Sequence, residues 1–285
     1  MSKILVTGAN GQLGQCIKEL ALTKGTKNTY IFKSSADLNI TEYAQVIAEF
    51  MLGQFDFCIN CAAYTNVDKA ESDLDNATNV NVIGAKNLAT ACGKTNTTLL
   101  HISTDFVFDG TKDSPYVETD ITSALGVYGQ TKLLGENEVI KNAPKYYIIR
   151  TSWLYSEYAH NFMKTMIRLA NERDALSVVS DQTGTPTYAK DLAEVLMHII
   201  NTNPIAYGIY HYSNEGIATW FDFAKAIFEI NNNTINLSPI ATEAYPLPAK
   251  RPKYSVMDKS KIKQALQIKI PDWKESLKSA IKALD

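Results

Sequence analysis

Tyr128 and Lys132 lie four residues apart in the segment YGQTK, a spacing that puts both side chains on one face of a helix. A phenol has an unperturbed pKa of about 10 and is a poor acid–base catalyst at neutral pH. A neighbouring ammonium group favours the phenolate and lowers this pKa, and a shift to about 7 takes roughly 4 kcal/mol. In a dry site, the pair predicts that Tyr128 transfers a proton to a carbonyl oxygen.

Thr104 comes 24 residues before Tyr128 and ends the apolar run TLLHIST. If this run is a strand of a parallel sheet, Thr104 lies at its carboxyl end, where ligands bind in such sheets. Its hydroxyl can donate a hydrogen bond to the same carbonyl oxygen. We therefore predict Thr104, Tyr128 and Lys132 as catalytic residues. For a Tyr-x-x-x-Lys segment taken alone, the alternative is an exposed tyrosine beside a solvated lysine.

Gly8, Gly11 and Gly14 follow the first apolar run in the segment GANGQLG and open a helical segment. Without Cβ atoms, such a turn can be tight, its backbone can approach a pyrophosphate, and the helix packs closely on the strand. The free N–H groups at the start of the helix face the anion. The loop therefore predicts a dinucleotide site; the alternative is three glycines that serve only helix packing.

The second apolar run, TYIFKSSADL, carries Lys33, Ser34 and Ser35 where many such domains have an acidic residue for the adenosine ribose. The missing carboxylate tolerates a 2′-phosphate, and the Lys33 ammonium attracts one. We therefore favour NADPH as the cofactor, with NADH as the alternative. Asp37 and Leu38 begin the loop that follows this run.

Strand-length apolar runs alternate with amphipathic segments, which is the periodicity of βαβ units. The runs are continuously apolar, as in parallel sheets covered on both faces. The expected strands are 3–8, 29–34, 57–63, 98–104 and 146–155, and the expected helices lie near 12–24, 42–53, 72–93 and 128–141. The sequence therefore predicts an α/β fold with a doubly wound, Rossmann-type parallel sheet and a smaller C-terminal substrate lobe.

The pattern loosens after residue 152. A helix near 160–173, a strand at 176–181, a helix near 187–201 and a strand at 208–214 are expected there. The last two repeat the earlier unit and should return to the first sheet. The predicted domains are an NAD(P)-binding domain of residues 1–152 and 187–214 and a substrate domain of residues 153–186 and 215–285. Three prolines make residues 244–255 irregular and extended.

The composition narrows the class of protein. With 285 residues, 45% of them hydrophobic, the chain is typical of globular proteins and is neither disordered nor fibrous. Its 28 basic and 30 acidic residues are mixed along the chain, so we expect no nucleic-acid partner. The apolar runs are too short for a signal peptide or a membrane span, so we expect no membrane partner and a cytoplasmic location. A homodimer is the default expectation for oligomeric state.

Cys58 and Cys61 form a CxxC, a spacing found in redox and zinc sites. In a strand, this odd offset puts the two side chains on opposite faces. No second CxxC or histidine pair completes a zinc set, so we predict buried structural cysteines and no metal site. His101 lies inside an apolar run and is predicted to be a core histidine.

The glycine loop, NCAA after the third run, STD at 103–105 and YxxxK resemble, in this order, the extended short-chain dehydrogenase/reductase superfamily over the whole chain. The strings NCAAYTNVDKAE, STDFVFDG, VYGQTKLLGE, RTSWLY, VVSDQTGTPT and PAKRPKYSVMD are similar to the dTDP-4-dehydrorhamnose reductase family. This resemblance implies NADPH-dependent reduction of the 4-keto group of dTDP-4-dehydro-β-L-rhamnose, with this nucleotide sugar as the small-molecule partner. It also implies Mg²⁺, for which the sequence offers no ligand cluster.

The resemblance assigns residues position by position, and Thr104, Tyr128 and Lys132 match the family's catalytic set. Besides Gly8, Gly14, Tyr128 and Lys132, the cofactor positions are Asn10, Gly11, Gln12, Leu13, Asp37, Leu38, Ala62, Ala63, Tyr64 and Thr65. The positions for the nucleotide sugar are Val67, Thr104, Asp105, Tyr128, Trp153 and Arg251, the last for its diphosphate. The alternatives are that Asp105 caps the following turn and that Trp153 is a core aromatic between lobes.

Two other functions stay open. Nucleotide-sugar epimerases and dehydratases have this fold and triad but retain their nicotinamide, and they commonly carry acidic residues directly after the active-site threonine. Here Asp105 is followed by Phe106. The regulatory subunit of methionine adenosyltransferase resembles these reductases without catalysing a reduction, and the intact Thr104, Tyr128 and Lys132 set argues against this function. Net consumption of NADPH separates the three.

Overall fold

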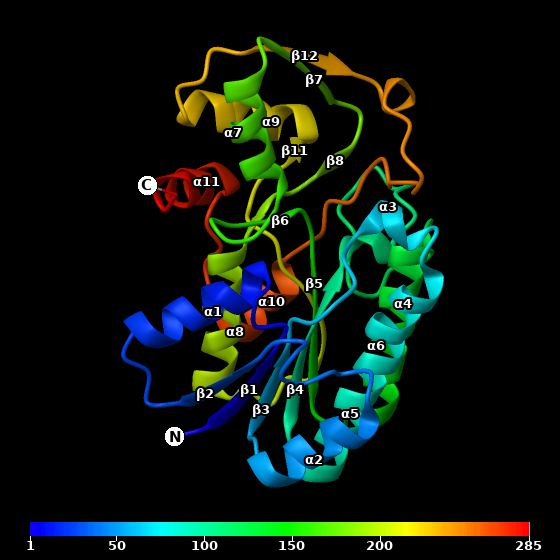
Figure 1. Ribbon diagram of the computed structural model, residues 1–285, viewed down its shortest axis with the longest axis vertical. Coiled ribbons are helices and arrows are strands. Elements are labelled where there is room, and N and C mark those ends of the chain that lie inside the picture. The colour runs from blue at the N-terminus through cyan, green and yellow to red at the C-terminus, as the bar shows by residue number, and fades with distance from the viewer. Residues whose placement is uncertain (285) are drawn as a thin grey trace.

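The computed structural model describes residues 1–284, which form two lobes (Figure 1). The larger lobe is a parallel sheet with helices on both faces, and the smaller lobe lies beyond the carboxyl ends of its strands. Within residues 1–284, no helix combines the length and the apolar character needed to cross a membrane. The predicted α/β fold with a doubly wound parallel sheet is confirmed.

Six strands form the central sheet, and all neighbouring pairs are parallel. They are β1 (Lys3–Thr7), β2 (Thr29–Lys33), β3 (Phe57–Asn60), β4 (Thr98–Thr104), β5 (Tyr146–Thr151) and β10 (Gly208–His211). Their order across the sheet is β10-β5-β4-β3-β1-β2. The chain runs outward from β1 to β2 and returns on the other side of β1 as β3. Ligands of open α/β sheets bind at such a reversal, outside the carboxyl ends of the strands.

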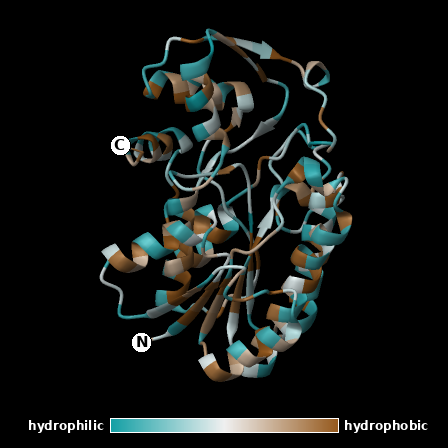
Figure 2. Ribbon diagram, in the orientation of Figure 1, coloured by the Kyte–Doolittle hydropathy of each residue, from teal (hydrophilic) through white to brown (hydrophobic). Residues whose placement is uncertain are grey.

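Helices cover both faces of the sheet, because both faces are apolar. On one face lie α1 (Gln12–Thr23), α8 (Ala189–Thr202) and α10 (Ser260–Leu266), and on the other α2 (Tyr43–Gly53), α5 (Ala85–Thr95) and α6 (Val127–Asn142). Within β1, Ile4 and Val6 belong to the first core and Leu5 to the second, as the two-residue repeat of a strand requires. Figure 2 shows the hydrophobic residues along these strands.

The CxxC segment follows the same repeat. Cys58 is buried in the core on the α2 and α5 side, and Cys61 packs against the core on the other side. The two side chains pack on different cores, so the predicted placement on opposite faces is confirmed, and both thiols are free. His101, on the neighbouring β4, is buried with its Nδ1 3.0 Å from Asn60 Nδ2, and burial lowers its pKa well below the usual value. It is a neutral core histidine, as predicted.

The smaller lobe packs helices against short strand pairs. Its elements are α7 (Phe162–Glu172), α9 (Trp220–Ile230), α11 (Trp273–Lys282), and the pairs β7 (Ala175–Val179) with β12 (Asn236–Ile240), β8 (Thr183–Gly184) with β11 (Ala218–Thr219), and β6 (Leu154–Tyr155) with β9 (Thr187–Tyr188). Its core includes Phe223 and Ile227 from α9 and Leu277 from α11. Residues 245–255 form no helix and only one isolated bridge, from Tyr254 to Thr183, so the segment is irregular after a short 3-10 turn that ends at Ala244.

The end of the chain belongs to both lobes. Ile262 of α10 is buried in the core under the sheet, whereas Leu277 of α11 is buried in the smaller lobe. The prediction that all of 215–285 belongs to the smaller lobe is therefore wrong at α10, a short helix whose packing partner its own sequence does not determine. The rest of the domain division remains our proposal.

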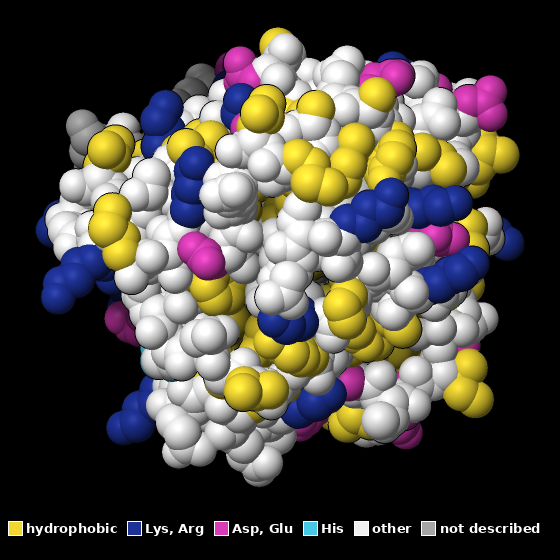
Figure 3. Space-filling model, turned by 90° about the horizontal axis from the view of Figure 1, so that it is seen from below, with side chains coloured by type: hydrophobic (Ala, Val, Ile, Leu, Met, Phe, Trp, Pro, Cys, Tyr) yellow, Lys and Arg dark blue, Asp and Glu magenta, His cyan; other side chains and the backbone are white. Residues whose placement is uncertain are grey.

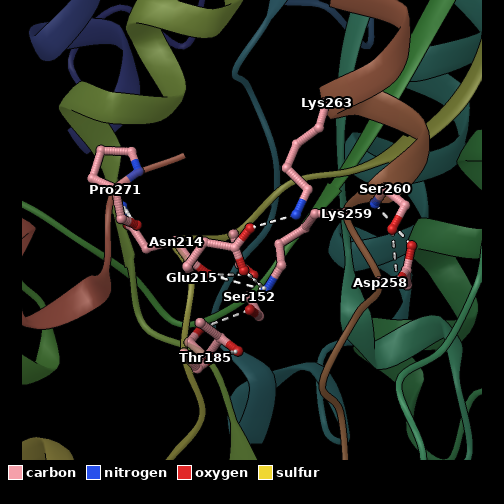
Figure 4. A network of polar contacts seen from close by, with 11 residues as sticks. Ser152, Thr185, Asn214, Glu215, Asp258, Lys259, Ser260, Lys263 and Pro271 are labelled. Carbon is pink, nitrogen blue, oxygen red and sulfur yellow. Dashed lines mark hydrogen bonds and ion pairs between the residues drawn. The ribbon is translucent and has the colours of Figure 1, made fainter. Parts of the chain in front are cut away.

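Polar contacts fasten the loop that follows β10 to this final part of the chain (Figure 4). The Lys259 ammonium donates to the Asn214 carbonyl oxygen at 3.2 Å and lies 3.4 Å from the Glu215 carboxylate. Lys263 pairs with Glu215 at 2.8 Å, and the Asn214 amide donates to the Pro271 carbonyl oxygen at 3.3 Å. These contacts tie α10 and the chain before α11 to the loop that follows β10.

The amino ends of the sheet strands form a second surface, opposite the carboxyl ends where the sequence predicts the site. Figure 3 shows this face from below, with hydrophobic and basic side chains interspersed. A groove of about 540 Å³ lies there, and Met51, Phe55, Lys94, Lys145 and Tyr207 are among its lining residues. It is at the amino ends of the strands, away from the end where the sequence predicts chemistry.

A buried ion pair holds α6 against the sheet. Glu136 accepts from Arg150 Nε at 2.9 Å and from Nη2 at 2.7 Å, and the Ser103 hydroxyl donates to the same carboxylate at 2.5 Å. The two charged side chains are only 1% and 3% exposed. A buried charge of this kind is costly to leave unpaired.

We expect Glu136→Ala to lower the free energy of unfolding by about 3–5 kcal/mol, because it leaves the Arg150 guanidinium buried without a charged partner. Urea titration measures this loss. The matched control is Glu172→Ala, which breaks an exposed pair with Arg168 and should cost under about 1 kcal/mol. Equal losses for the two variants would contradict the proposed anchoring of α6.

Candidate active site

The three predicted catalytic residues come from two neighbouring elements. Thr104 is the last residue of β4, and Tyr128 and Lys132 lie on the first two turns of α6. Lys132 is 2% exposed, and its ammonium donates to the Ile102 carbonyl oxygen of β4 at 2.6 Å. The structure therefore brings α6 and the carboxyl end of β4 together at these side chains.

Close backbone packing sets the position of Tyr128. A Cβ atom at Gly129 would overlap the carbonyl oxygen of Phe106, so only glycine lets the first turn of α6 approach the turn after β4. The Tyr128 ring packs edge-on against the Phe106 ring with centroids 5.6 Å apart. Tyr128 is thereby held beside the segment that begins at Thr104.

The pKa of Tyr128 moves in the opposite direction to the one predicted from the sequence. Burial, with a smaller contribution from Asp105, raises it to about 12, although hydrogen bonding with Thr104 acts the other way. Burial also lowers the pKa of Lys132 to about 8. Desolvation is the largest cause of the Tyr128 shift, and the Lys132 ammonium donates to a backbone carbonyl oxygen rather than to the phenol. Tyr128 is therefore a protonated phenol at neutral pH.

Thr104, rather than Asp105, caps the turn after β4. The Thr104 hydroxyl accepts from the Phe106 N–H at 3.2 Å and donates to Asp105 Oδ1 at 3.0 Å. Asp105 is 1% exposed, and its Oδ2 has no partner among residues 1–284. Burial raises its pKa to about 6. The capping alternative for Asp105 is therefore wrong, and a buried acceptor next to Thr104 needs a donor.

The glycine loop follows β1 and packs against the chain just after β3. Gly8 has φ +66°, and a Cβ there would lie 2.5 Å from the Ala62 nitrogen. A Cβ at Gly14 would lie 2.6 Å from the Gly8 oxygen, so both positions need glycine for packing. At Gly11 the nearest atom would be 3.3 Å away, and Gly11 offers α1 no side-chain cap. The first N–H groups of α1 thus have space and hydrogen-bonding capacity for an anion.

Two predicted members of this loop turn their side chains elsewhere. Gln12 Oε1 accepts from Ser156 Oγ and Asn161 Nδ2, each at 3.0 Å, so this side chain joins the two lobes. Leu13 is buried in the core of the sheet, whereas Asn10 is exposed. Gln12 and Leu13 can therefore serve a phosphate only through their backbone.

The fold brings carboxylates close to the end of β2, although the strand itself has none. The Lys33 ammonium lies 3.2 Å from the Glu49 carboxylate of α2. Asp37 accepts from the Ser34 nitrogen at 2.9 Å and from its hydroxyl at 2.6 Å, and these bonds lower the pKa of Asp37. Leu38 is buried in the core beside α2. Sequence reasoning missed Glu49, because nothing in the order of residues pairs a strand end with that helix position.

The loop after β3 is fixed by an asparagine that sequence reasoning also missed. Asn81 accepts from the Tyr64 nitrogen at 2.9 Å and donates to the Tyr64 oxygen and the Thr131 hydroxyl, each at 3.1 Å. It lies on a π-helical segment, Asn79–Gly84, between α4 (Leu74–Thr78) and α5. This segment divides the helix predicted over 72–93. Such wide turns occur often at functional sites.

The other predicted residues of this loop line the same stretch of backbone. Ala62 and Ala63 are half-buried and Thr65 is exposed, and the Ala62 nitrogen donates to Asn60 Oδ1 at 3.1 Å. Val67 is half-buried and begins α3 (Val67–Ala70). The loop therefore runs from the end of β3 directly into α3.

Trp153 lies where the chain passes from β5 into the smaller lobe. Its φ is +46°, and its ring stacks on Trp220 at 3.7 Å with 10° between the planes. A Cβ at Gly184 would lie 2.7 Å from Trp153 Cε2. Trp153 is half-buried, and Trp220 is an aromatic neighbour that sequence reasoning missed.

Arg251 makes a bidentate ion pair with Asp68 of α3. Its Nη1 lies 3.1 Å from Asp68 Oδ1 and its Nη2 lies 2.7 Å from Oδ2. The Ala249 nitrogen donates to the same carboxylate at 3.2 Å. The segment 244–255 is therefore fastened to α3, near which it lies in Figure 1. Arg251, which is predicted to bind the diphosphate, therefore already has Asp68 as a partner within the protein.

A magnesium ion held by this chain does not fit the side chains. Across residues 1–284, no three His, Cys, Asp or Glu side chains gather as a set of metal ligands.

Comparison with known proteins agrees with this geometry. The family model described as the RmlD substrate binding domain matches residues 2–285. The dTDP-4-dehydrorhamnose reductase of Aggregatibacter actinomycetemcomitans is 43% identical, over 98% of both chains, and that of Escherichia coli is 37% identical, over 99% of this chain and 97% of its own.

Solved structures agree as well. A dTDP-4-dehydrorhamnose reductase from Clostridium acetobutylicum has a TM-score of 0.95 at 44% identity, covering 99% of both chains. The Bacillus anthracis enzyme, solved in complex with NADP, has a TM-score of 0.94 at 39% identity, again over 99% of both chains. With a family match over nearly its whole length, this chain belongs to the RmlD family, the family of the dTDP-4-dehydrorhamnose reductases.

Proposed function

We propose that this protein reduces the 4-keto group of dTDP-4-dehydro-β-L-rhamnose with NADPH to give dTDP-β-L-rhamnose, the last step of dTDP-L-rhamnose synthesis. The observation that carries the proposal is the set of buried Thr104, buried Lys132 and half-buried Tyr128, which lies at the carboxyl ends of the sheet strands, as the glycine loop does. The similarity to dTDP-4-dehydrorhamnose reductases that are 43% and 44% identical over nearly their full length supports the choice of substrate.

The glycine loop fits a nicotinamide dinucleotide, since Gly11 leaves free the space that a Cβ would fill and α1 has uncapped N–H groups. The residues that would hold it are Gly8, Asn10, Gly11, Gln12, Leu13 and Gly14 at the pyrophosphate, Asp37 and Leu38 at the adenine side, and Ala62, Ala63, Tyr64, Thr65, Tyr128 and Lys132 at the nicotinamide side. Bound there, the reduced nicotinamide supplies the hydride.

Tyr128 donates the proton to the carbonyl oxygen. Its pKa of about 12 keeps the phenol protonated at neutral pH, which is the state that a proton donor needs. The Thr104 hydroxyl donates to the same oxygen, and for this it turns away from Asp105 Oδ1. A sugar hydroxyl then serves as donor to the Asp105 carboxylate, whose Oδ2 is otherwise unpartnered.

The nucleotide sugar is held between the two lobes by Val67, Asp105, Trp153 and Arg251. Arg251 binds the diphosphate by exchanging the two oxygens of Asp68 for two phosphate oxygens, since a guanidinium suits bidentate contact with either group. Trp153 offers a half-buried aromatic side chain, stacked on Trp220, at the start of the smaller lobe.

We expect the purified protein to consume one NADPH for each molecule of dTDP-4-dehydrorhamnose, measured as loss of the reduced nicotinamide absorbance. The same assay with NADH gives the cofactor preference. A sugar product formed without net loss of NADPH would indicate an epimerase or dehydratase. Cofactor binding without any sugar product would indicate a binding module.

We expect Tyr128→Phe to lower kcat by about 10²–10⁴-fold, because the variant has no proton to donate. The NADPH dissociation constant and the thermal midpoint should remain those of the wild type. Tyr43→Phe, which removes the hydroxyl of a partly exposed tyrosine on α2, is the matched control and should have normal turnover. Near-normal turnover of the Tyr128 variant would refute the mechanism.

We expect Glu49→Gln to raise the affinity for NADPH relative to NADH by about fivefold, because it removes a negative charge beside Lys33 and the 2′-phosphate. Fluorescence titration of both cofactors measures the ratio, and the effect should shrink at high salt. Glu42→Gln, at the start of the same helix, is the control. If the ratio does not change, the 2′-phosphate does not bind at Lys33.

A further inference from the structure

The catalytic helix α6 has no N-terminal cap in its own sequence. Its N-cap residue is Gly126, which has no side chain to accept a hydrogen bond, and the first turn contains no acidic residue. The first N–H groups of a helix have no partner within the helix and need one elsewhere. The first N–H groups of α6, next to Tyr128, therefore need an acceptor from another part of the chain.

Glu71 supplies this cap from 56 residues earlier in the chain. Its Oε1 accepts a hydrogen bond from the Val127 nitrogen, the first residue of α6, at 2.9 Å. A Cβ at Gly126 would lie 2.7 Å from the same oxygen, so the glycine leaves room for the carboxylate. A negative group at this end of a helix is also favoured by the helix dipole.

This cap acts on the residue next to Tyr128. The far side of the same turn is fixed by Gly129 against the carbonyl of Phe106, next to Thr104. Glu71 holds the near side through Val127. The first turn of α6 is thus fixed on both sides, and losing one contact lets Tyr128 shift relative to Thr104.

Glu71 follows α3, the short helix that begins where the loop after β3 ends. Asp68 of the same helix binds Arg251. The short segment of α3 and Glu71 therefore adjoins the proposed cofactor loop, binds Arg251 and contacts the start of α6. We propose that Glu71 is a positioning residue for the reaction: it fixes Tyr128 by capping α6. This rests on the proposed role of Tyr128 as proton donor.

The test compares kcat and binding for the full-length protein with NADPH and dTDP-4-dehydrorhamnose. Glu71→Ala removes the acceptor and should lower kcat by about tenfold, with the NADPH dissociation constant unchanged. Glu71→Gln retains an acceptor and should stay within about threefold of the wild type. Glu42→Ala is the matched control, because Glu42 occupies the N-cap position of α2 and its side chain makes no cap bond.

A second variant tests the cap if Glu71→Ala does not fold. Gly126→Ala puts a methyl group where the carboxylate lies and should reproduce the loss of kcat with the fold retained. Combined with Glu71→Ala, it should cause no further loss, since both changes remove one interaction.

The Tyr128→Phe background separates positioning from general destabilisation. Because Glu71 acts through Tyr128, adding Glu71→Ala to Tyr128→Phe should leave the residual rate unchanged. A further loss in this background, a normal kcat in folded Glu71→Ala or Gly126→Ala, or equal losses for alanine and glutamine at position 71 would each overturn the proposal. Full turnover of Tyr128→Phe would instead refute the role of Tyr128, and the positioning role with it.

Discussion

Backbone contact between α6 and the elements around it is the constraint on which the site depends. A Cβ at Gly129 would overlap the Phe106 oxygen, and one at Gly135 would overlap the Asn81 oxygen. Glycine inside a helix costs about 1 kcal/mol relative to alanine, so this sequence is unfavourable for an isolated helix. The close approach allows the Lys132 ammonium to reach the Ile102 carbonyl and the buried Glu136 to reach Arg150. The proposed catalytic residues are thus placed by contacts that an ordinary helix surface would prevent.

The sequence predicts well whatever depends on neighbours in the chain. The runs that became β1 to β5 are continuously apolar, and Tyr128 and Lys132 share a helix face through their spacing alone. The loop of Gly8, Gly11 and Gly14 likewise lies where a strand passes into a helix. These features are local, so composition and period suffice to locate them.

The residues that sequence reasoning missed make contacts across the fold. Glu49 pairs with Lys33, Glu71 caps α6, and Asn81 joins the loop after β3 to α6, each over 16 or more residues. No local sequence pattern predicts such partners. The direction of the Tyr128 pKa was missed for a related reason, since the amount of desolvation depends on how the whole site is packed.

The ion pair between Arg251 and Asp68 has a consequence for ligand choice. An anion that binds Arg251 must displace a carboxylate that is already aligned with both guanidinium nitrogens. Asp68 thus acts as an internal competitor, and small monovalent anions from the solvent gain little by replacing it. A ligand that presents two charged oxygens while its other parts are anchored elsewhere overcomes this competition, so selectivity arises before any contact with the sugar.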